Sequence, residues 1–255
     1  MDELVRVGNL PCDIFTENSF TTANEYFTDL ANQHFLHLQH QRNSAIDDEN
    51  DCRKKYIAHC LFRKITQEIE TDPGPFHLYC DDLRPSNVLV SETDLSINGV
   101  IDWEFTYVAP AEFTYAAPWW LLFECPEEWD LDTFMSRYTP RLEVFLKVLR
   151  ACEQKQMLLK SLESFQCLSD RMACSLESGL FWFCLAARKG YMFDEIYWKF
   201  LDNKYFGPFT SLDDRLALLS QSEQEELEGF VQKKMQEATE KTLDEHMPFD
   251  KLVDL

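Results

Sequence analysis

The chain has 255 residues, of which 45% are apolar and 14% aromatic, enough for one large domain or two small ones with a substantial core. This composition excludes general disorder. The 24 Lys and Arg against 45 Asp and Glu give a net charge of −21, which disfavours nucleic acid and membrane surfaces as partners. The favoured interpretation is that this charge only keeps the protein in solution; the alternative is that it attracts amines, other cations or metal ions.

The cysteines and the apolar stretches indicate the compartment. Nine cysteines are scattered without a CxxC pair, which favours a reducing environment over a disulfide framework. Residues 1–4 lack the basic and apolar regions of a signal peptide. The most apolar stretch, residues 180–187, is far shorter than the roughly 20 residues that span a bilayer. We therefore predict a cytoplasmic protein.

Two helices are predicted in the first third of the chain. Apolar residues recur at helical spacing over residues 27–38 and 56–69, separated by a polar loop over 42–50. Three histidines of the first helix recur at every third position: His34, His37 and His40. They could bind zinc, but this spacing drifts around a helix, so a partly buried helix face is the favoured interpretation.

Short strands are predicted next. Residues 71–75 form a Pro- and Gly-containing breaker, after which apolar and polar residues alternate over 76–80, as in a strand. Two further apolar runs, 88–90 and 97–101, flank the turn-forming residues 91–94. We expect these two runs to pair as a β-hairpin.

From about residue 131 onward the pattern is helical again. Apolar residues at three-to-four spacing predict helices over 142–149, 158–165, 172–187 and 193–201. Residues 220–244 predict an acidic amphipathic helix, with these residues on one side: Leu227, Phe230, Val231, Met235 and Ala238. This helix could dock a partner, although packing on its own domain is the favoured interpretation.

Three polar residues stand around the predicted hairpin. Asp82 and Asn87 are five residues apart on one irregular loop, because Pro85 prevents a helix between them. The hairpin leaves this loop and returns to it, which brings Asp102 close to Asn87. We expect the three side chains to converge at the open end of the hairpin.

This combination suits phosphoryl transfer. Carboxylate and amide oxygens are ligands that Mg²⁺ prefers, and a further carboxylate can accept the proton of an attacking hydroxyl. Each acidic residue alone could be a turn residue or a strand-end cap. The spacing of all three, with strand sequence between them, favours the kinase pattern of base, metal ligand and metal ligand.

Two segments carry a family resemblance. Residues 76–90, FHLYCDDLRPSNVLV, and residues 99–105, GVIDWEF, resemble the aminoglycoside phosphotransferase/choline kinase-like family, in its large fungal branch. Residues 109–113, 118–122 and 191–207 are also similar to that branch, as is the helical region around Phe181 and Trp182. The resemblance covers roughly residues 10–210.

The resemblance implies a fold and a set of roles. The fold is α+β, mainly α: a protein-kinase-like C-terminal lobe over residues 1–210, with the catalytic loop and hairpin at 76–105, followed by an acidic helical tail over 211–255. The resemblance implies that Asp82 is the catalytic base, with Arg84 beside it. It implies that Ser86 and Asn87 bind the ATP cofactor and that Asn87 and Asp102 are Mg²⁺ ligands. Arg84 and Ser86 would position the loop. Glu104 could contact a cationic substrate or be an exposed residue at a strand end.

The sequence departs from the family pattern in two places. Cys80 replaces the His that opens the family's catalytic loop; that His mainly braces the loop. Before Asp82 the only glycines are Gly8 and Gly74, neither between strands, and the lysines of that part fall on a helical pattern. The glycine-rich loop and strand lysine of an N-terminal lobe are therefore expected to be missing.

Three functions follow as alternatives. The chain could transfer the γ-phosphate of ATP, with Mg²⁺, to a hydroxyl of a small molecule, either cationic or neutral. It could instead be a pseudokinase or binding module without turnover. It could also be a truncated product whose exposed apolar surface leads to self-association.

Overall fold

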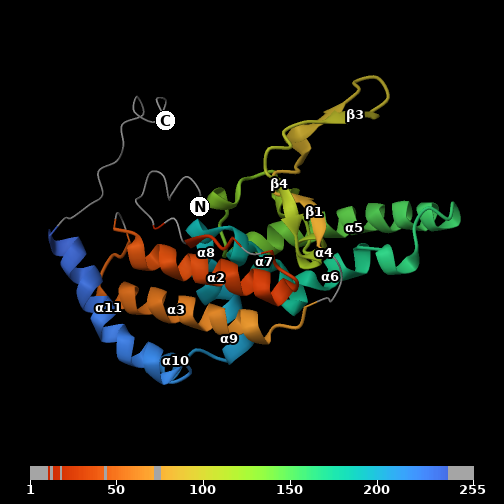
Figure 1. The fold of residues 1–255 in the computed structure, drawn as a ribbon. Helices are drawn as coiled ribbons and strands as arrows, with labels where there is room; N and C mark the ends of the chain where they lie inside the picture. The colour runs from red at the N-terminus through yellow and green to blue at the C-terminus, as the bar shows by residue number, and fades with distance from the viewer. Residues whose placement is uncertain (1–10, 12–13, 18, 43–44, 72–75, 241–255) are drawn as a thin grey trace. The chain divides into compact units, whose positions relative to one another are not determined.

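The structure is a computed structural model that describes residues 11, 14–17, 19–42, 45–71 and 76–240. The described part is mainly helical, with two small antiparallel sheets of two strands each (Figure 1). The predicted α+β, mainly α class is confirmed at this level. No described helix combines the length and the apolar character needed to cross a lipid bilayer.

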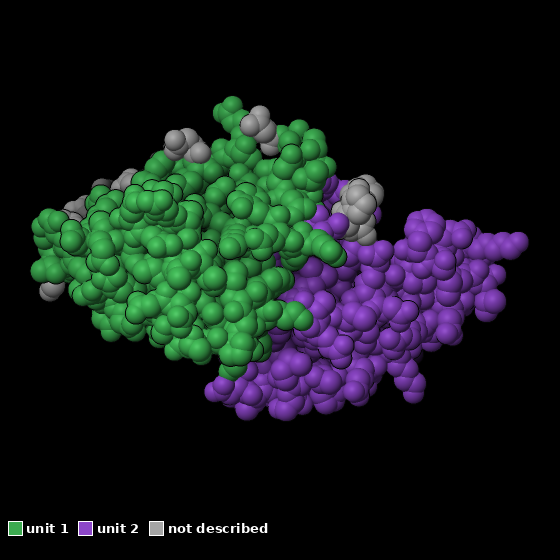
Figure 2. Space-filling view, turned by 90° about the horizontal axis from the view of Figure 1, so that it is seen from below, with its two compact units in different colours: residues 1–70, 186–255 green, residues 71–185 purple. Residues whose placement is uncertain are grey.

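The chain divides into two compact units, coloured separately in Figure 2. Unit 1 comprises Met1–Glu70 and Ala186–Leu255, and unit 2 comprises Thr71–Leu185. The prediction of a kinase-like segment up to residue 210 followed by a tail stays a prediction, and residues 241–255 of that tail lie outside the described residues.

Two helices of unit 1 form where the apolar periodicity predicts them: α2 (Ala23–His40) and α3 (Glu49–Glu68). Thr22 and Glu25 form a capping box at the start of α2, and the Asp48 side chain accepts a hydrogen bond from the Asp51 N–H at the start of α3. These caps satisfy N–H groups that have no partner within the helix. Residues 72–75 of the predicted breaker lie outside the described residues.

The last described helix of unit 1, α11 (Gln221–Glu240), packs on α3. Leu227, Phe230 and Val231 are buried, and the Phe230 ring lies 5.0 Å from that of Tyr56. The favoured prediction, packing on the same body as the preceding helices, is confirmed for this apolar face. Ala238 is exposed, contrary to its expected place on that face.

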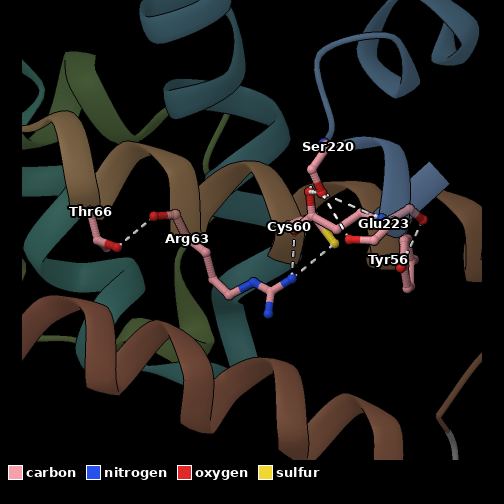
Figure 3. A network of polar contacts seen from close by, with 7 residues as sticks. Tyr56, Cys60, Arg63, Thr66, Ser220 and Glu223 are labelled. Carbon is pink, nitrogen blue, oxygen red and sulfur yellow. Dashed lines mark hydrogen bonds and ion pairs between the residues drawn. The ribbon is translucent and has the colours of Figure 1, made fainter. Parts of the chain in front are cut away.

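A polar network fixes the start of α11 on α3 (Figure 3). The Arg63 guanidinium donates to the Glu223 carboxylate at 2.7 Å and to Cys60 Sγ at 3.6 Å. The Tyr56 hydroxyl donates to the backbone oxygen of Glu223 at 3.0 Å. Burial raises the pKa of Cys60 to about 12, so this thiol stays protonated and unreactive.

The predicted histidine face of α2 is partly buried, as the favoured interpretation expects. His34 is buried, its Nε2 lies 2.9 Å from the Ala187 backbone oxygen, and its ring stacks on Phe193. Burial lowers the pKa of His34 and of His37, so both rings favour the neutral form.

The predicted helix over 193–201 is interrupted by a change of winding. It consists of α8 (Phe193–Ile196) and a π-helical turn (Tyr197–Leu201), and α9 (Asp202–Phe206) follows directly. A buried ion pair joins α9 to α10 (Leu212–Leu216): Arg215 donates to both carboxylate oxygens of Asp202, at 2.8 and 2.9 Å.

Unit 2 has an aromatic core under its long helix, α5 (Phe134–Leu158). The core lies against α4 (Ala111–Tyr115), α6 (Ser169–Ser178) and the first part of α7 (Leu180–Arg188). These rings pack together in it: Phe134, Tyr138, Phe181 and Trp182.

Two predictions of helix extent in unit 2 are wrong. The helix predicted over 158–165 does not form as a unit, because α5 ends at Leu158, Lys160 takes a left-handed φ of 56°, and only a short 3₁₀ turn follows at Ser164–Gln166. The predicted helix over 172–187 is two helices, because Gly179, with a φ of 82°, ends α6. Glycine adopts that conformation without steric cost.

Four short strands complete unit 2. β2 (Val88–Val90) pairs with β3 (Ile97–Val100), which confirms the predicted hairpin. β1 (His77–Cys80), also predicted, pairs with β4 (Thr106–Ala109), for which the sequence analysis made no prediction.

Candidate active site

The loop that follows β1 is held at both ends by backbone hydrogen bonds. At its start, the Asp81 N–H donates to the Phe105 oxygen at 3.0 Å, which continues the β1–β4 pairing. At its end, residues 85–87 form a 3₁₀ turn, and the Ile101 N–H donates to the Asn87 oxygen at 2.9 Å. The hairpin therefore does return the chain to this loop, as predicted.

Asp82 and Asn87 are in direct contact. Asn87 is buried, and its Nδ2 donates to the backbone oxygen of Asp82 at 2.8 Å and to the carboxylate Oδ2 at 3.0 Å. The amide nitrogen is thus committed to the loop, which leaves Oδ1 as the atom of Asn87 that could bind a metal. These bonds fix the Asp82 carboxylate relative to the start of β2.

Arg84 pairs with the other oxygen of the same carboxylate. Its Nε lies 3.0 Å from Asp82 Oδ1, and its Nη1 contacts Cys125 Sγ at 3.8 Å. Both partners are partly solvent-accessible, so the pair contributes little to folding stability. The Arg84 Nε makes no hydrogen bond within the described structure, so the bond from Asn87 to Oδ2 is the contact that orients the Asp82 carboxylate, and Arg84 adds a positive charge beside Oδ1.

Asp102 follows β3 with a strained backbone. Its φ is 66°, a left-handed conformation that is uncommon outside glycine but that Asp tolerates better than most residues. Its side chain is exposed, as are those of Ser86 and Glu104. The backbone bond from Ile101 to Asn87 joins the residue before Asp102 to the loop, but no hydrogen bond of the described residues joins the Asp102 carboxylate to Asp82 or Asn87, so the expected convergence of the three side chains stays a prediction.

A buried tryptophan, Trp119, is hydrogen-bonded to the backbone of the Asp82 loop. Trp119 is 7% exposed, and its Nε1 donates to the backbone oxygen of Asp81 at 3.3 Å. The sequence alone did not predict a contact of Trp119 or Cys125 with the Asp82 loop. Neither contact has a signal in the spacing, since both residues come from the irregular segment after α4.

The chemistry of the donor set fits a hard cation. The carboxylates of Asp82 and Asp102 and the amide oxygen of Asn87 are all ligands that Mg²⁺ accepts. Within the described part of the chain, no group of three or more His, Cys, Asp and Glu side chains is arranged to hold a metal. A cation here would therefore depend on oxygens from a phosphate or water in addition to these residues.

The sequence around the loop is strongly acidic. Residues 71–136 contain 13 Asp and Glu, and Arg84 is the only Lys or Arg among them. Since Arg84 pairs with Asp82, the surroundings of the loop favour cations over anions.

Comparisons with protein-family models, curated proteins and solved structures found no match to this chain. The family resemblance therefore rests on the residues quoted above.

Proposed function

We propose that this chain is a phosphotransferase of the aminoglycoside phosphotransferase/choline kinase-like family, acting on a hydroxyl of a small molecule with ATP and Mg²⁺. The observation that carries the proposal is the fixed Asp82 carboxylate. Asn87 donates to one oxygen and Arg84 pairs with the other. A carboxylate oxygen can accept more than one hydrogen bond, so the held group can still receive a hydroxyl proton.

In this proposal each residue has a separate role. Asp82 orients the substrate hydroxyl and accepts its proton, which raises the nucleophilicity of the oxygen. Arg84 keeps the base in place, and Ser86 stands at the exposed side of the same turn. Asn87, through Oδ1, and Asp102 would hold Mg²⁺, which supplies charge neutralisation for the transferred phosphoryl group.

The charge of the segment supports a cationic substrate. Exposed carboxylates such as Glu104 lie near the loop, and residues 71–136 carry 13 acidic side chains against one basic one. An amine or quaternary ammonium group would be attracted to such a region, and its hydroxyl would be delivered to Asp82. We therefore expect amino alcohols or aminated sugars to be better substrates than neutral sugars.

One observation favours a second candidate, a binding module without turnover. Phosphoryl transfer requires cations that grip the triphosphate, and Arg84, the one basic side chain of residues 71–136, is paired with Asp82. A protein of this kind would retain the loop and hairpin and bind a cationic molecule, with little affinity for nucleotide.

Calorimetric titration with Mg-ATP tests the two candidates. The phosphotransferase proposal expects binding that disappears in Asp102→Ala and persists in Asp94→Ala, a matched change on the same hairpin outside the loop. Transfer from labelled ATP to a panel of amino alcohols and aminated sugars then tests turnover. No heat with Mg-ATP, together with binding of a cationic molecule from the panel, would contradict the first candidate and support the second.

A further inference from the structure

The hairpin of unit 2, residues 88–100, exposes large apolar side chains. Leu95 is 78% exposed and Ile97 is 69% exposed, and Leu89 and Val90 are each about half exposed. An isolated two-stranded hairpin is at best marginally stable in water, and its outer strand edges offer unpaired backbone groups. A surface of this kind is typical of a protein-protein contact.

The charge of the hairpin is negative. From Pro85 to Ser136 the chain contains no Lys or Arg, and the turn of the hairpin carries Glu92 and Asp94, both exposed. Hydrogen bonds from Ser91 and Ser96 lower the pKa of Asp94 to about 2, so its carboxylate is ionised at neutral pH. The hairpin therefore offers apolar side chains beside a fixed negative charge.

The second uncovered surface is on α5. We define its outer face as Val144, Lys147, Val148, Ala151 and Lys155, all exposed. Their spacing of three and four residues places them on one side of the helix, opposite the buried Leu142 and Leu146.

This face is basic in an acidic protein. α5 contains five Lys and Arg and two Glu, but Arg137 and Arg150 are ion-paired with Glu124 and Asp170. Glu153 is buried, where it accepts hydrogen bonds from Leu168 and Ser169. The positive charge of the outer face therefore comes from Lys147 and Lys155, with the exposed Glu143 beside that face. Val144 is 65% exposed and Val148 is 58% exposed between the lysines. The outer face of α5 thus combines apolar side chains with positive charge, the complement of the hairpin.

The two surfaces do not cover each other within one chain. Both belong to unit 2, and the hairpin stands clear of α5 in Figure 1. The exposure of Leu95 and Val144 also shows that the two surfaces are not in contact within one chain, because such a contact would bury both side chains. A complementary surface is available on every other copy of the chain.

We infer that the outer face of α5 in one copy of this chain docks on the hairpin of a second copy. Lys147 and Lys155 would face Glu92 and Asp94, while the valines of α5 cover the leucine and isoleucine side chains of the hairpin. Two different surfaces meet, so the contact either occurs twice in a symmetric pair or continues head to tail to a third chain. An anionic lipid surface is the less favoured occupant of α5, because a net charge of −21 opposes approach to it.

Charge exchange between two variants tests this contact. Variant A, Lys147→Glu with Lys155→Glu, makes the outer face of α5 acidic. Variant B, Glu92→Lys with Asp94→Asn, makes the hairpin turn basic and keeps an acceptor oxygen for Ser96. The mass in solution is measured by light scattering for the wild type, for each variant and for their equal mixture.

We expect the wild type to show the mass of at least two chains at high protein concentration and to dissociate on dilution. Variants A and B should each have the mass of one chain, since like charges then face each other. Their mixture should regain the mass of a complex, because the altered helix of A matches the altered hairpin of B. The control Lys54→Glu with Lys233→Glu, two exposed lysines of unit 1, should associate like the wild type.

A wild type that stays a single chain at high concentration would overturn the inference, and so would a mixture of folded A and B that stays monomeric. Binding of the wild type to anionic vesicles, without any change in mass in their absence, would assign the α5 face to lipid instead. If A or B fails to fold by circular dichroism, Val144→Ser with Val148→Ser replaces it. That pair should also give a single chain, and an unchanged complex would contradict the proposed face.

Discussion

The α3–α11 pair of unit 1 and the hairpin of unit 2 differ in how far their apolar side chains are buried. Between α3 and α11, apolar residues are buried and polar ones are paired, as in the contact of Arg63 with Glu223. In the hairpin, Leu95 and Ile97 face solvent although they are apolar. Burial of apolar side chains therefore stabilises the α3–α11 pair, whereas it contributes little to the hairpin that follows Asp82. We expect local unfolding to begin in this hairpin.

Breaking the buried ion pair of unit 1 should have the largest effect on stability. Arg215 and Asp202 are almost inaccessible and joined by two hydrogen bonds, so Arg215→Ala leaves a buried carboxylate without its partner. We expect a loss of about 3–5 kcal/mol in the free energy of unfolding. Urea denaturation measures it, with Arg215→Lys as the control that keeps the charge. A loss under about 1 kcal/mol, the usual value for exposed pairs, would show that the pair is not buried in solution.

Removing Trp119, which contacts the loop that carries Asp82, should have the next largest effect. Trp119 is buried and also donates to the Asp81 oxygen, so Trp119→Ala creates a cavity and removes a hydrogen bond. We expect the free energy of unfolding to fall by about 3 kcal/mol, in the lower part of the range for large aromatic deletions.

Trp119→Phe is the matched control, because it keeps most of the ring and loses only the indole N–H. This variant should lower the free energy of unfolding by about 1 kcal/mol, the contribution of one hydrogen bond. If Trp119→Ala changed the free energy of unfolding by less than about 0.5 kcal/mol, the Pro118–Trp120 segment would be a surface feature, and its role under the loop would be wrong.

A buried carboxyl in unit 1 should give a pH dependence of stability. Burial raises the pKa of Asp194 to about 6, and its Oδ1 makes no hydrogen bond within the described structure. Because this value lies above the ordinary 3.8, the folded state binds the proton more tightly than the unfolded state. The resulting stabilisation is complete below the ordinary pKa and is lost as the pH rises through about 6.

The variant Asp194→Asn removes this ionisable group. Relative to the wild type, its free energy of unfolding should increase between about pH 4 and about pH 7, because only the wild type loses stability there through this carboxyl. The exposed Asp213→Asn should track the wild type at both values. A constant difference between Asp194→Asn and the wild type across this range would contradict the raised pKa.

The sequence predicted well those features that depend on local periodicity. The two N-terminal helices and the β2–β3 hairpin follow from apolar spacing and from the turn residues between the strands. The helix predicted over 158–165 has the same spacing, but Leu158 and Phe165 are exposed in the structure, so nothing holds that segment helical. Periodicity shows which face a helix would bury and not whether a surface exists to receive it.

The candidate site was predictable only in part. The proximity of Asp82 to Asn87 follows from a short loop, and the return of the hairpin places Asp102 nearby. The contacts of Arg84 with Cys125 and of Trp119 with Asp81 join residues about forty positions apart through an irregular segment. No spacing rule relates such positions.

The last prediction separates activity from stability at the loop itself. Asp82→Ala removes the ion pair with Arg84 and one of the two hydrogen bonds from Asn87, whose Nδ2 still reaches the backbone oxygen of residue 82. Because this pair is partly exposed, we expect a change in the free energy of unfolding below about 1 kcal/mol. Under the proposed function, transfer from ATP should fall by about 10²–10⁴-fold, the contribution of a positioned base. Asp81→Asn, on the neighbouring carboxylate, serves as the control and should retain turnover. Unchanged transfer in Asp82→Ala would show that Asp82 is not the base. A large loss of stability would instead show that this carboxylate stabilises the loop. The hairpin region would then differ less from the α3–α11 pair than the exposure of its side chains indicates.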